Sequence, residues 1–149
     1  MTHINFTFRN TKPLSVNAAK AINWKTKRHH NSEKYGILKQ RIQILMMCRR
    51  KEIEAFERAF NPKLQHLFNT IKVYVPKPMM FLKGKEEISS RKGDNSNQIK
   101  VIEDIVFSFF NKIDDRYTCN SQIRQIVSPN NEWHIEFSLK AMENTTLYE

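Results

Sequence analysis

The sequence has 149 residues, a length typical of a single domain, and 40% of them are hydrophobic. Ten phenylalanines against only three glycines favour a folded core and exclude a disordered tail. Lys and Arg number 25 against 15 Asp and Glu, and the resulting charge of +10 favours a polyanionic partner such as nucleic acid over a surface biased for solubility alone.

The cysteines and the hydropathy pattern bear on the cell compartment. Cys48 and Cys119 lie far apart and show no metal-ligand spacing, so we expect free thiols in a reducing compartment. No apolar run follows a basic start at the N-terminus, and no stretch of about twenty apolar residues occurs. We therefore expect a cytoplasmic protein with no signal peptide and no membrane partner.

The first predicted strand lies near the N-terminus, where Ile4, Phe6 and Phe8 alternate with polar residues. The polar and basic segment over residues 12–30 predicts a loop. Trp24 in this loop is either a stacking group for nucleic acid or the buried anchor of an ordinary surface loop. Three cations of the loop are candidate DNA-binding residues: Lys25, Lys27 and Arg28.

One long helix is predicted to begin after Ser32, whose hydroxyl can cap it, and to end at Asn61-Pro62. Its apolar residues recur at helical spacing: Leu38, Ile42, Leu45, Ile53, Phe56 and Phe60. A second strand is predicted over residues 67–75, closed by Pro76.

Residues 79–93 predict a long loop rich in Lys, Ser and Gly, and loops of this length are often functional. Four of its cations are further candidate DNA-binding residues: Lys83, Lys85, Arg91 and Lys92. A second helix is predicted over residues 98–110, and two more strands over 121–128 and 133–140. The order β-α-β-α-β-β predicts an α+β fold, with a small mixed sheet of about four strands and two main helices, in one domain over 1–149.

Acidic residues are scarce, and several gather around the second helix. Asp94 precedes this helix, Lys100 and Asp104 share one of its faces, and Asp115 follows eleven residues later. A phosphodiesterase needs carboxylates to hold Mg²⁺ and a cation to stabilise charge in the transition state, and these residues supply both. The alternative is structural, with Asp94 as a turn or capping residue and Lys100–Asp104 as a surface ion pair.

The spacing resembles the metal-site motif of the RusA family of Holliday-junction resolvases. Six positions carry this resemblance: Asp94, Asn97, Lys100, Asp104, Asp114 and Asp115. Pro13-Leu14-Ser15-Val16-Asn17 is similar to the segment after the family's first strand, and Ser121-Gln122-Ile123 to the strand after the Asp pair, allowing a two-residue insertion. The order of strands and helices agrees over nearly the whole chain.

This resemblance implies a homodimer, from a bacterial or phage-infected cell, that binds four-way DNA junctions. It implies paired symmetric cuts by phosphodiester hydrolysis with Mg²⁺, or Mn²⁺ in its place, during recombination and repair. By position, Asp94 and Asp115 would bind metal, Lys100 would lie near the scissile phosphate, and Asn97 would brace the site. These three, Asp94, Lys100 and Asp115, are the catalytic candidates, and Asp104 and Asp114 are further metal candidates.

One position departs from the family, which has a second metal-binding Asp where this chain has Ser96. A hydroxyl is a poorer Mg²⁺ ligand, but Mg²⁺ is often held by one or two carboxylates with water and substrate phosphate. Three outcomes follow: Ser96 serves in a weaker site, Glu103, Asp104 or Asp114 compensates, or the protein binds junctions or other nucleic acid without cutting them.

The length of the second helix also limits the site. A helix over residues 98–110 would be about 20 Å long, with Asp94 before one end and Asp115 beyond the other. The two meet only if the chain folds back along the helix, or if a partner subunit supplies one of them.

Overall fold

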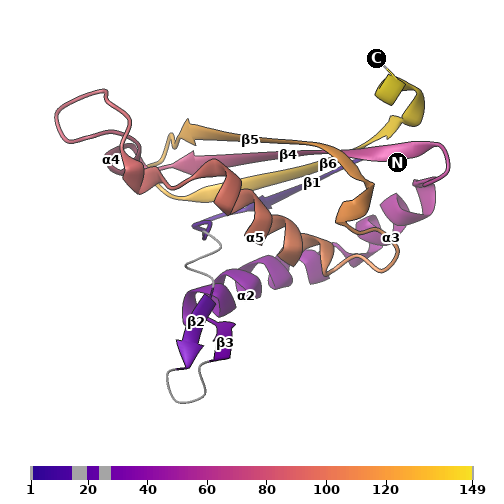
Figure 1. The fold of residues 1–149 in the computed structure, drawn as a ribbon, viewed down its shortest axis with the longest axis horizontal. Coiled ribbons are helices and arrows are strands. Elements are labelled where there is room, and N and C mark those ends of the chain that lie inside the picture. The colour runs from indigo at the N-terminus through magenta and orange to yellow at the C-terminus, as the bar shows by residue number, and fades with distance from the viewer. Residues whose placement is uncertain (1, 15–19, 24–27, 149) are drawn as a thin grey trace.

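The computed structural model describes residues 2–14, 20–23 and 28–148, and for 20–23, 28–31 and 95–97 it describes the backbone alone (Figure 1). Trp24, Lys25, Lys27 and the segment Ser15-Val16-Asn17 therefore lie outside the described residues. The side chains of Arg28, Ser96 and Asn97 also lie outside them.

The body of the protein is a four-stranded mixed sheet. Its strands are β1 (His3–Phe8), β4 (Gln65–Val75), β5 (Thr118–Val127) and β6 (His134–Glu143), in the order β1-β6-β4-β5. β6 pairs antiparallel with both β1 and β4, whereas β5 pairs parallel with β4 and forms one edge of the sheet. All four predicted strands are confirmed, with ends shifted by up to three residues.

The helices α2 (Glu33–Cys48), α3 (Arg50–Ala59) and α5 (Asn95–Phe107) cover one face of this sheet (Figure 1). The alternation of β1, with Ile4, Phe6 and Phe8 buried and polar residues between them, turns its apolar side toward the helices. In β4 the residues at odd positions from Leu67 to Val75 are buried in the same way. The layers of helix and mixed sheet confirm the α+β prediction.

The long helix predicted over residues 33–60 is two helices, and this expectation was wrong. Ser32 caps α2 as predicted, since its Oγ accepts from the N–H of Tyr35, but the helix ends at Arg49, whose φ is −111° and ψ is 22°. The guanidinium of Arg49 donates to the backbone carbonyl of Asn5 and lies 4.8 Å from the ring centroid of Phe6. These contacts with β1 favour a bend that helical periodicity alone does not reveal.

The loop predicted over residues 12–30 contains a hairpin, which also corrects the sequence analysis. β2 (Lys20–Asn23) pairs antiparallel with β3 (Arg28–Asn31), with Lys20 opposite Asn31. This hairpin forms a separate two-stranded sheet just before α2. Its strands are too short and too polar to show the alternation by which strands are recognised.

The connection from β4 to β5 is long because parallel neighbours need a crossover. It contains α4 (Lys77–Met80), a bridge between Phe81 and Ile88, the 3₁₀ turn η1 (Ser90–Lys92), α5, and a second 3₁₀ turn η2 (Asp115–Tyr117). The loop predicted over residues 79–93 is therefore partly ordered, and α5 begins and ends three residues earlier than predicted. A last 3₁₀ segment, η3 (Asn144–Tyr148), follows β6.

The turn after α5 is fixed by a buried carboxylate. Glu57 of α3 is 7% exposed and accepts hydrogen bonds from the backbone N–H groups of Asn111, Lys112 and Ile113. These bonds hold the chain where it reverses from α5 toward η2. The position of Asp114 and Asp115 therefore depends on a residue more than fifty positions earlier in the chain.

Replacing this carboxylate should destabilise the fold. We expect Glu57→Ala to lower the free energy of unfolding by about 2 kcal/mol, because three backbone donors lose a charged acceptor. Urea denaturation followed by circular dichroism measures the change. Glu54→Ala, an exposed position on the same helix, is the matched control and should change stability by less than about 0.5 kcal/mol. Equal effects of the two substitutions would contradict the role of Glu57.

Candidate functional site on α5 and η2

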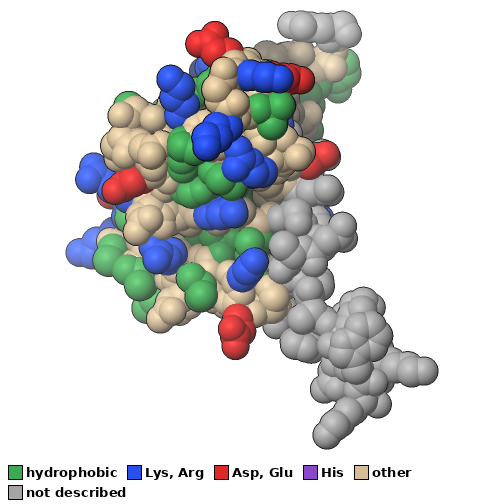
Figure 2. All heavy atoms as spheres, turned by 90° about the vertical axis from the view of Figure 1, so that its left-hand side faces the viewer, with side chains coloured by type: hydrophobic (Ala, Val, Ile, Leu, Met, Phe, Trp, Pro, Cys, Tyr) green, Lys and Arg blue, Asp and Glu red, His purple; other side chains and the backbone are tan. Residues whose placement is uncertain are grey.

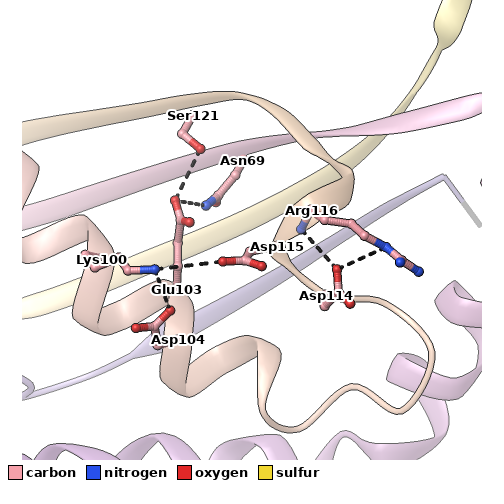
Figure 3. A network of polar contacts seen from close by, with 8 residues as sticks. All are labelled: Asn69, Lys100, Glu103, Asp104, Asp114, Asp115, Arg116 and Ser121. Carbon is pink, nitrogen blue, oxygen red and sulfur yellow. Dashed lines mark hydrogen bonds and ion pairs between the residues drawn. The ribbon is translucent and has the colours of Figure 1, made fainter.

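The reversal after α5 brings Asp115 back against the helix (Figure 3). Lys100 Nζ lies 3.2 Å from Asp104 Oδ1, one turn further along α5, and 3.9 Å from Asp115 Oδ2. The fold-back that the helix length required therefore takes place within one chain, at least as far as Lys100. All three side chains are about half exposed, so the cluster is open to a ligand from solvent.

Glu103 forms the inner part of this cluster, between α5 and the sheet (Figure 3). Its Oε1 accepts hydrogen bonds from Asn69 Nδ2 of β4 at 2.9 Å and from Ser121 Oγ of β5 at 3.2 Å. Burial raises the pKa of Glu103, and the negative charge of Asp115 raises it further, against the opposing effect of these hydrogen bonds and of Lys100. Glu103 and Asp115 both lie beside Lys100 (Figure 3).

The charge of Lys100 is well supported. The hydrogen bond to Asp104 raises the pKa of Lys100, and the charges of Asp104, Asp115 and Glu103 add to the increase despite some burial. Lys100 therefore stays protonated and presents a fixed positive charge among three carboxylates.

Asp114 faces the other way and has a local role (Figure 3). Its Oδ1 accepts from the N–H of Arg116 at 3.0 Å, which caps η2, and lies 3.6 Å from Arg116 Nε. The two adjacent aspartates therefore have different roles: Asp114 caps the η2 turn, and Asp115 contacts Lys100.

Asp94 lies at the start of α5, away from this cluster. Its carbonyl accepts from the N–H of Gln98, and its side chain is exposed. Lys100 is six residues further on, or about 9 Å along the helix axis. The structure thus brings Lys100, Glu103, Asp104 and Asp115 together (Figure 3), whereas Asp94 lies before the first turn of α5.

The backbone before Asp94 is held in place by two amide side chains. Gln98 Nε2 donates to the carbonyl of Lys92 at 3.0 Å, and Gln125 Nε2 donates to the carbonyls of Lys92 and Gly93 at 3.1 and 3.2 Å. Gly93 has φ +87°, and a Cβ there would fall 2.0 Å from Gln98 Nε2. Gln125 lies four residues beyond Ser121 on β5, so this loop is about 13 Å from the level of Glu103.

Sequence reasoning missed Asn69, Ser121, Gln98 and Gln125 as parts of the site. Asn69 gave a usable signal, because it interrupts the apolar row from Leu67 to Val75 and is fully buried. A polar residue at such a position needs a partner, and that partner is Glu103. The Oδ1 of Asn69 has no hydrogen-bond partner among the described residues.

The described candidate DNA-binding cations lie near α4, where Figure 2 shows Lys and Arg side chains gathered. Lys83 and Lys85 are exposed, and Lys92 Nζ donates to the carbonyl of Gly93 at 3.2 Å. Arg91 holds the loop together, since its Nη2 donates to the carbonyl of Pro78 at 2.8 Å and its Nε to Ser89 Oγ at 3.2 Å.

No family model matches the chain, and no curated protein matches it. Within the described residues, no helix is both long enough and apolar enough to span a membrane, and no group of three or more His, Cys, Asp or Glu is placed to hold a metal ion. Cys48 and Cys119 are both free and exposed.

The raised pKa of Glu103 predicts a pH-dependent effect of Glu103→Gln. When the pKa of an acid is higher in the folded protein than in the unfolded chain, the folded protein binds the proton more tightly. The free energy of unfolding therefore falls as pH rises from the pKa of the unfolded chain to the pKa of the folded protein. Gln resembles the protonated acid and can still accept from Asn69 and Ser121. We therefore expect Glu103→Gln to gain stability relative to the unmodified protein as pH rises from about 4 toward 7.

Urea denaturation of both proteins across this range measures the difference in unfolding free energy. The exposed Glu54→Gln substitution on α3 is the matched control. A constant difference for Glu103→Gln, or one that shrinks as pH rises, would contradict the assigned environment of Glu103.

Proposed function

We propose that this chain is a Mg²⁺-dependent endonuclease that cuts four-way DNA junctions, as its resemblance to the RusA family implies. The observation that supports this most is the placement of Lys100 between Asp104 and Asp115, at 3.2 and 3.9 Å. The motif residues Lys100 and Asp115 are fifteen positions apart and lie on separate elements, yet they contact each other. A cation beside carboxylates is the combination that phosphodiester hydrolysis uses, and the charge of +10 favours approach of DNA.

The donor set at Glu103 and Asp115 fits a hard divalent cation. Mg²⁺ takes oxygen ligands and is commonly held by one or two carboxylates with water and substrate phosphate. Both side chains lie beside Lys100, whose Nζ is 3.9 Å from Asp115 Oδ2 (Figure 3). The unpartnered Oδ1 of Asn69 belongs to the same buried side chain that donates to Glu103. Mn²⁺ accepts the same donors.

Each residue then has a distinct part. When bound, Mg²⁺ would polarise the phosphate and promote attack by water. Glu103 and Asp115 would hold the cation, and Asn69 and Ser121 fix the orientation of Glu103 through its Oε1. Lys100 presents its positive charge to the scissile phosphate, where negative charge grows in the transition state.

Asp94 is a candidate metal ligand because of the resemblance to the RusA family and not because of a contact with Asp115. Its distance from Lys100 along α5 makes Glu103 the better partner for Asp115 within one chain. In the proposed homodimer a second subunit brings a second Asp94, which is the remaining route by which Asp94 and Asp115 could share a metal.

A second candidate function is junction binding without cleavage. Ser96 supplies no carboxylate where the family has one, and Lys100 already balances part of the charge of Asp104 and Asp115. Both features weaken metal affinity. The charge of the protein and its exposed lysines serve binding equally well without hydrolysis.

Cleavage of a synthetic four-way junction at 1–10 mM Mg²⁺ or Mn²⁺ tests the first function against the second. Asp104 and Asp115 both contact Lys100, but only Asp115 is assigned to the metal, so their Asn variants form a matched pair. We expect Asp115→Asn and Glu103→Gln each to lower the cleavage rate by about 10²-fold or more, and Asp104→Asn by less than about tenfold. Glu54→Gln on α3 is the control without effect.

Junction binding by a protein that never nicks at millimolar metal would establish the second function instead. Equal losses in Asp104→Asn and Asp115→Asn would contradict the assignment of Asp115 as the ligand while leaving cleavage itself intact.

Restoring the missing carboxylate provides a test of the resemblance. If the metal lies where the resemblance implies, Ser96→Asp should raise cleavage at low Mg²⁺ and lower the metal concentration for half-maximal rate by about tenfold, since a charged ligand replaces a neutral one. A metal held by Glu103 and Asp115 within one chain, seven residues further along α5 than position 96, predicts no such gain. Ser96→Asn, of the same size but uncharged, is the matched control. No difference between the two variants would show that position 96 is not at the metal site.

A further inference from the structure

A cleft of about 980 Å³ opens where the connection after β4 folds over the end of β5. One wall is formed by residues 77–86 together with Arg91, and the other by residues 127–131. The cleft lies at the carboxyl ends of the parallel strands β4 and β5, an edge at which open sheets of α/β type often bind ligands. It is separate from the Lys100–Asp115 cluster, which lies near the start of β5.

The walls of this cleft are fixed by hydrogen bonds. Arg91 joins the carbonyl of Pro78 to Ser89 Oγ, and Phe81 pairs with Ile88 across the loop. On the other side, the N–H of Ser128 donates to Val75 O at 2.8 Å, and the N–H of Lys77 to Asn131 Oδ1 at 3.2 Å. The cleft is therefore formed before any ligand arrives, which reduces the entropy lost on binding.

The lining combines positive charge with apolar surface. Four cations, Lys77, Lys83, Lys85 and Arg91, face a single acid, Glu86. Phe81, which is partly exposed, lines the cleft together with four other apolar residues: Pro78, Leu82, Val127 and Pro129. Figure 2 shows this side of the molecule, with Lys and Arg side chains surrounding hydrophobic ones.

We propose that this cleft binds unpaired nucleotides of single-stranded DNA. An unpaired strand offers phosphates to the lysines and a flat apolar base face to Phe81, and stacking on an aromatic side chain contributes about 1–3 kcal/mol per base. A DNA duplex hides its base faces in the stack, so it could meet the cations but not the apolar lining. An acidic peptide offers negative charge without flat apolar faces.

The role of this cleft rests on the proposed function, whereas the binding itself does not. Ser121, which binds Glu103, and Val127, which lines the cleft, are six residues apart on β5, or about 20 Å. The cleft could therefore hold a strand opened at the branch point while the Lys100 cluster meets the phosphate to be cut.

The test is the affinity of the full chain for a fluorescent twelve-nucleotide oligo(dT), measured by anisotropy in EDTA so that no cleavage can occur. A DNA duplex of the same length is measured in parallel. We expect Phe81→Leu, which keeps the apolar bulk and removes the aromatic face, to weaken oligo(dT) binding about five- to tenfold and leave duplex binding within twofold. The double variant Lys83→Glu/Lys85→Glu, at two exposed positions, should weaken oligo(dT) binding by more than tenfold.

Lys63→Glu, an exposed lysine in the turn before β4, is the matched control for charge and should change oligo(dT) affinity by less than threefold. An unchanged affinity in both cleft variants would overturn the proposal, as would equal losses in Lys63→Glu and the double variant. Displacement of oligo(dT) by poly-glutamate as readily as by unlabelled oligo(dT) would show a site for any polyanion. Tighter binding of oligo(rU) than of oligo(dT) would assign the cleft to RNA.

Failure of this inference can be distinguished from failure of the proposed function. If the protein cleaves junctions but shows no preference for oligo(dT), only the proposal for the cleft is contradicted. If the protein binds oligo(dT) but does not cleave junctions in Mg²⁺ or Mn²⁺, only the proposed nuclease function is contradicted.

Discussion

The parallel pairing of β4 and β5 is the constraint on which both candidate sites depend. Parallel neighbours cannot be joined by a tight turn, so the chain must leave one end of β4, cross a face of the sheet and return to the start of β5. The crossover carries α5 over the sheet and places Glu103 above Asn69 and Ser121. The same crossover leaves a long connection at the carboxyl ends of the strands, where it forms the basic cleft.

The crossover places the Glu103 carboxylate in an environment that is unfavourable for its charge. Burial disfavours its charged form, and Asp115 adds a second negative charge nearby, so two hydrogen bonds and Lys100 are needed to offset the effect. A positive charge near Glu103 therefore stabilises the ionised form of its carboxylate. Under the proposed function, a divalent cation would offset the negative charge of Glu103 and Asp115.

Elements with a strong local pattern were predictable from the sequence, and those that depend on distant contacts were not. The alternation of Ile4, Phe6 and Phe8 with polar residues indicates which side of β1 is buried, and Ser32 indicates the start of α2. The break at Arg49 depends on the carbonyl of Asn5 and the ring of Phe6, more than forty positions away. No periodicity within the helix carries that information.

The candidate site shows the same division. The motif spacing identified Lys100, Asp104 and Asp115, because a helix places residues four apart on one face and an adjacent pair of aspartates indicates a turn. The resemblance also implied that Asp94 and Asp115 bind metal, whereas the length of the helix left open whether they meet within one chain or across a dimer. The contacts that hold Glu103 come from Asn69 of β4 and Ser121 of β5, and they follow from strand pairing rather than from spacing.

The separation of Asp94 from the Lys100 cluster gives the protein two unlike surfaces. At the start of α5, Gln98 and Gln125 fix the carbonyls before Asp94 next to a cleft rich in lysine. About 13 Å back toward the start of β5, carboxylates gather around a single lysine. Phosphate groups are attracted to the first surface and repelled by the second unless a cation is present. Under the proposed function, DNA can therefore bind at the cleft without metal, while its approach to Glu103 and Asp115 requires a cation between phosphate and carboxylate. Metal would then control cutting more strongly than binding.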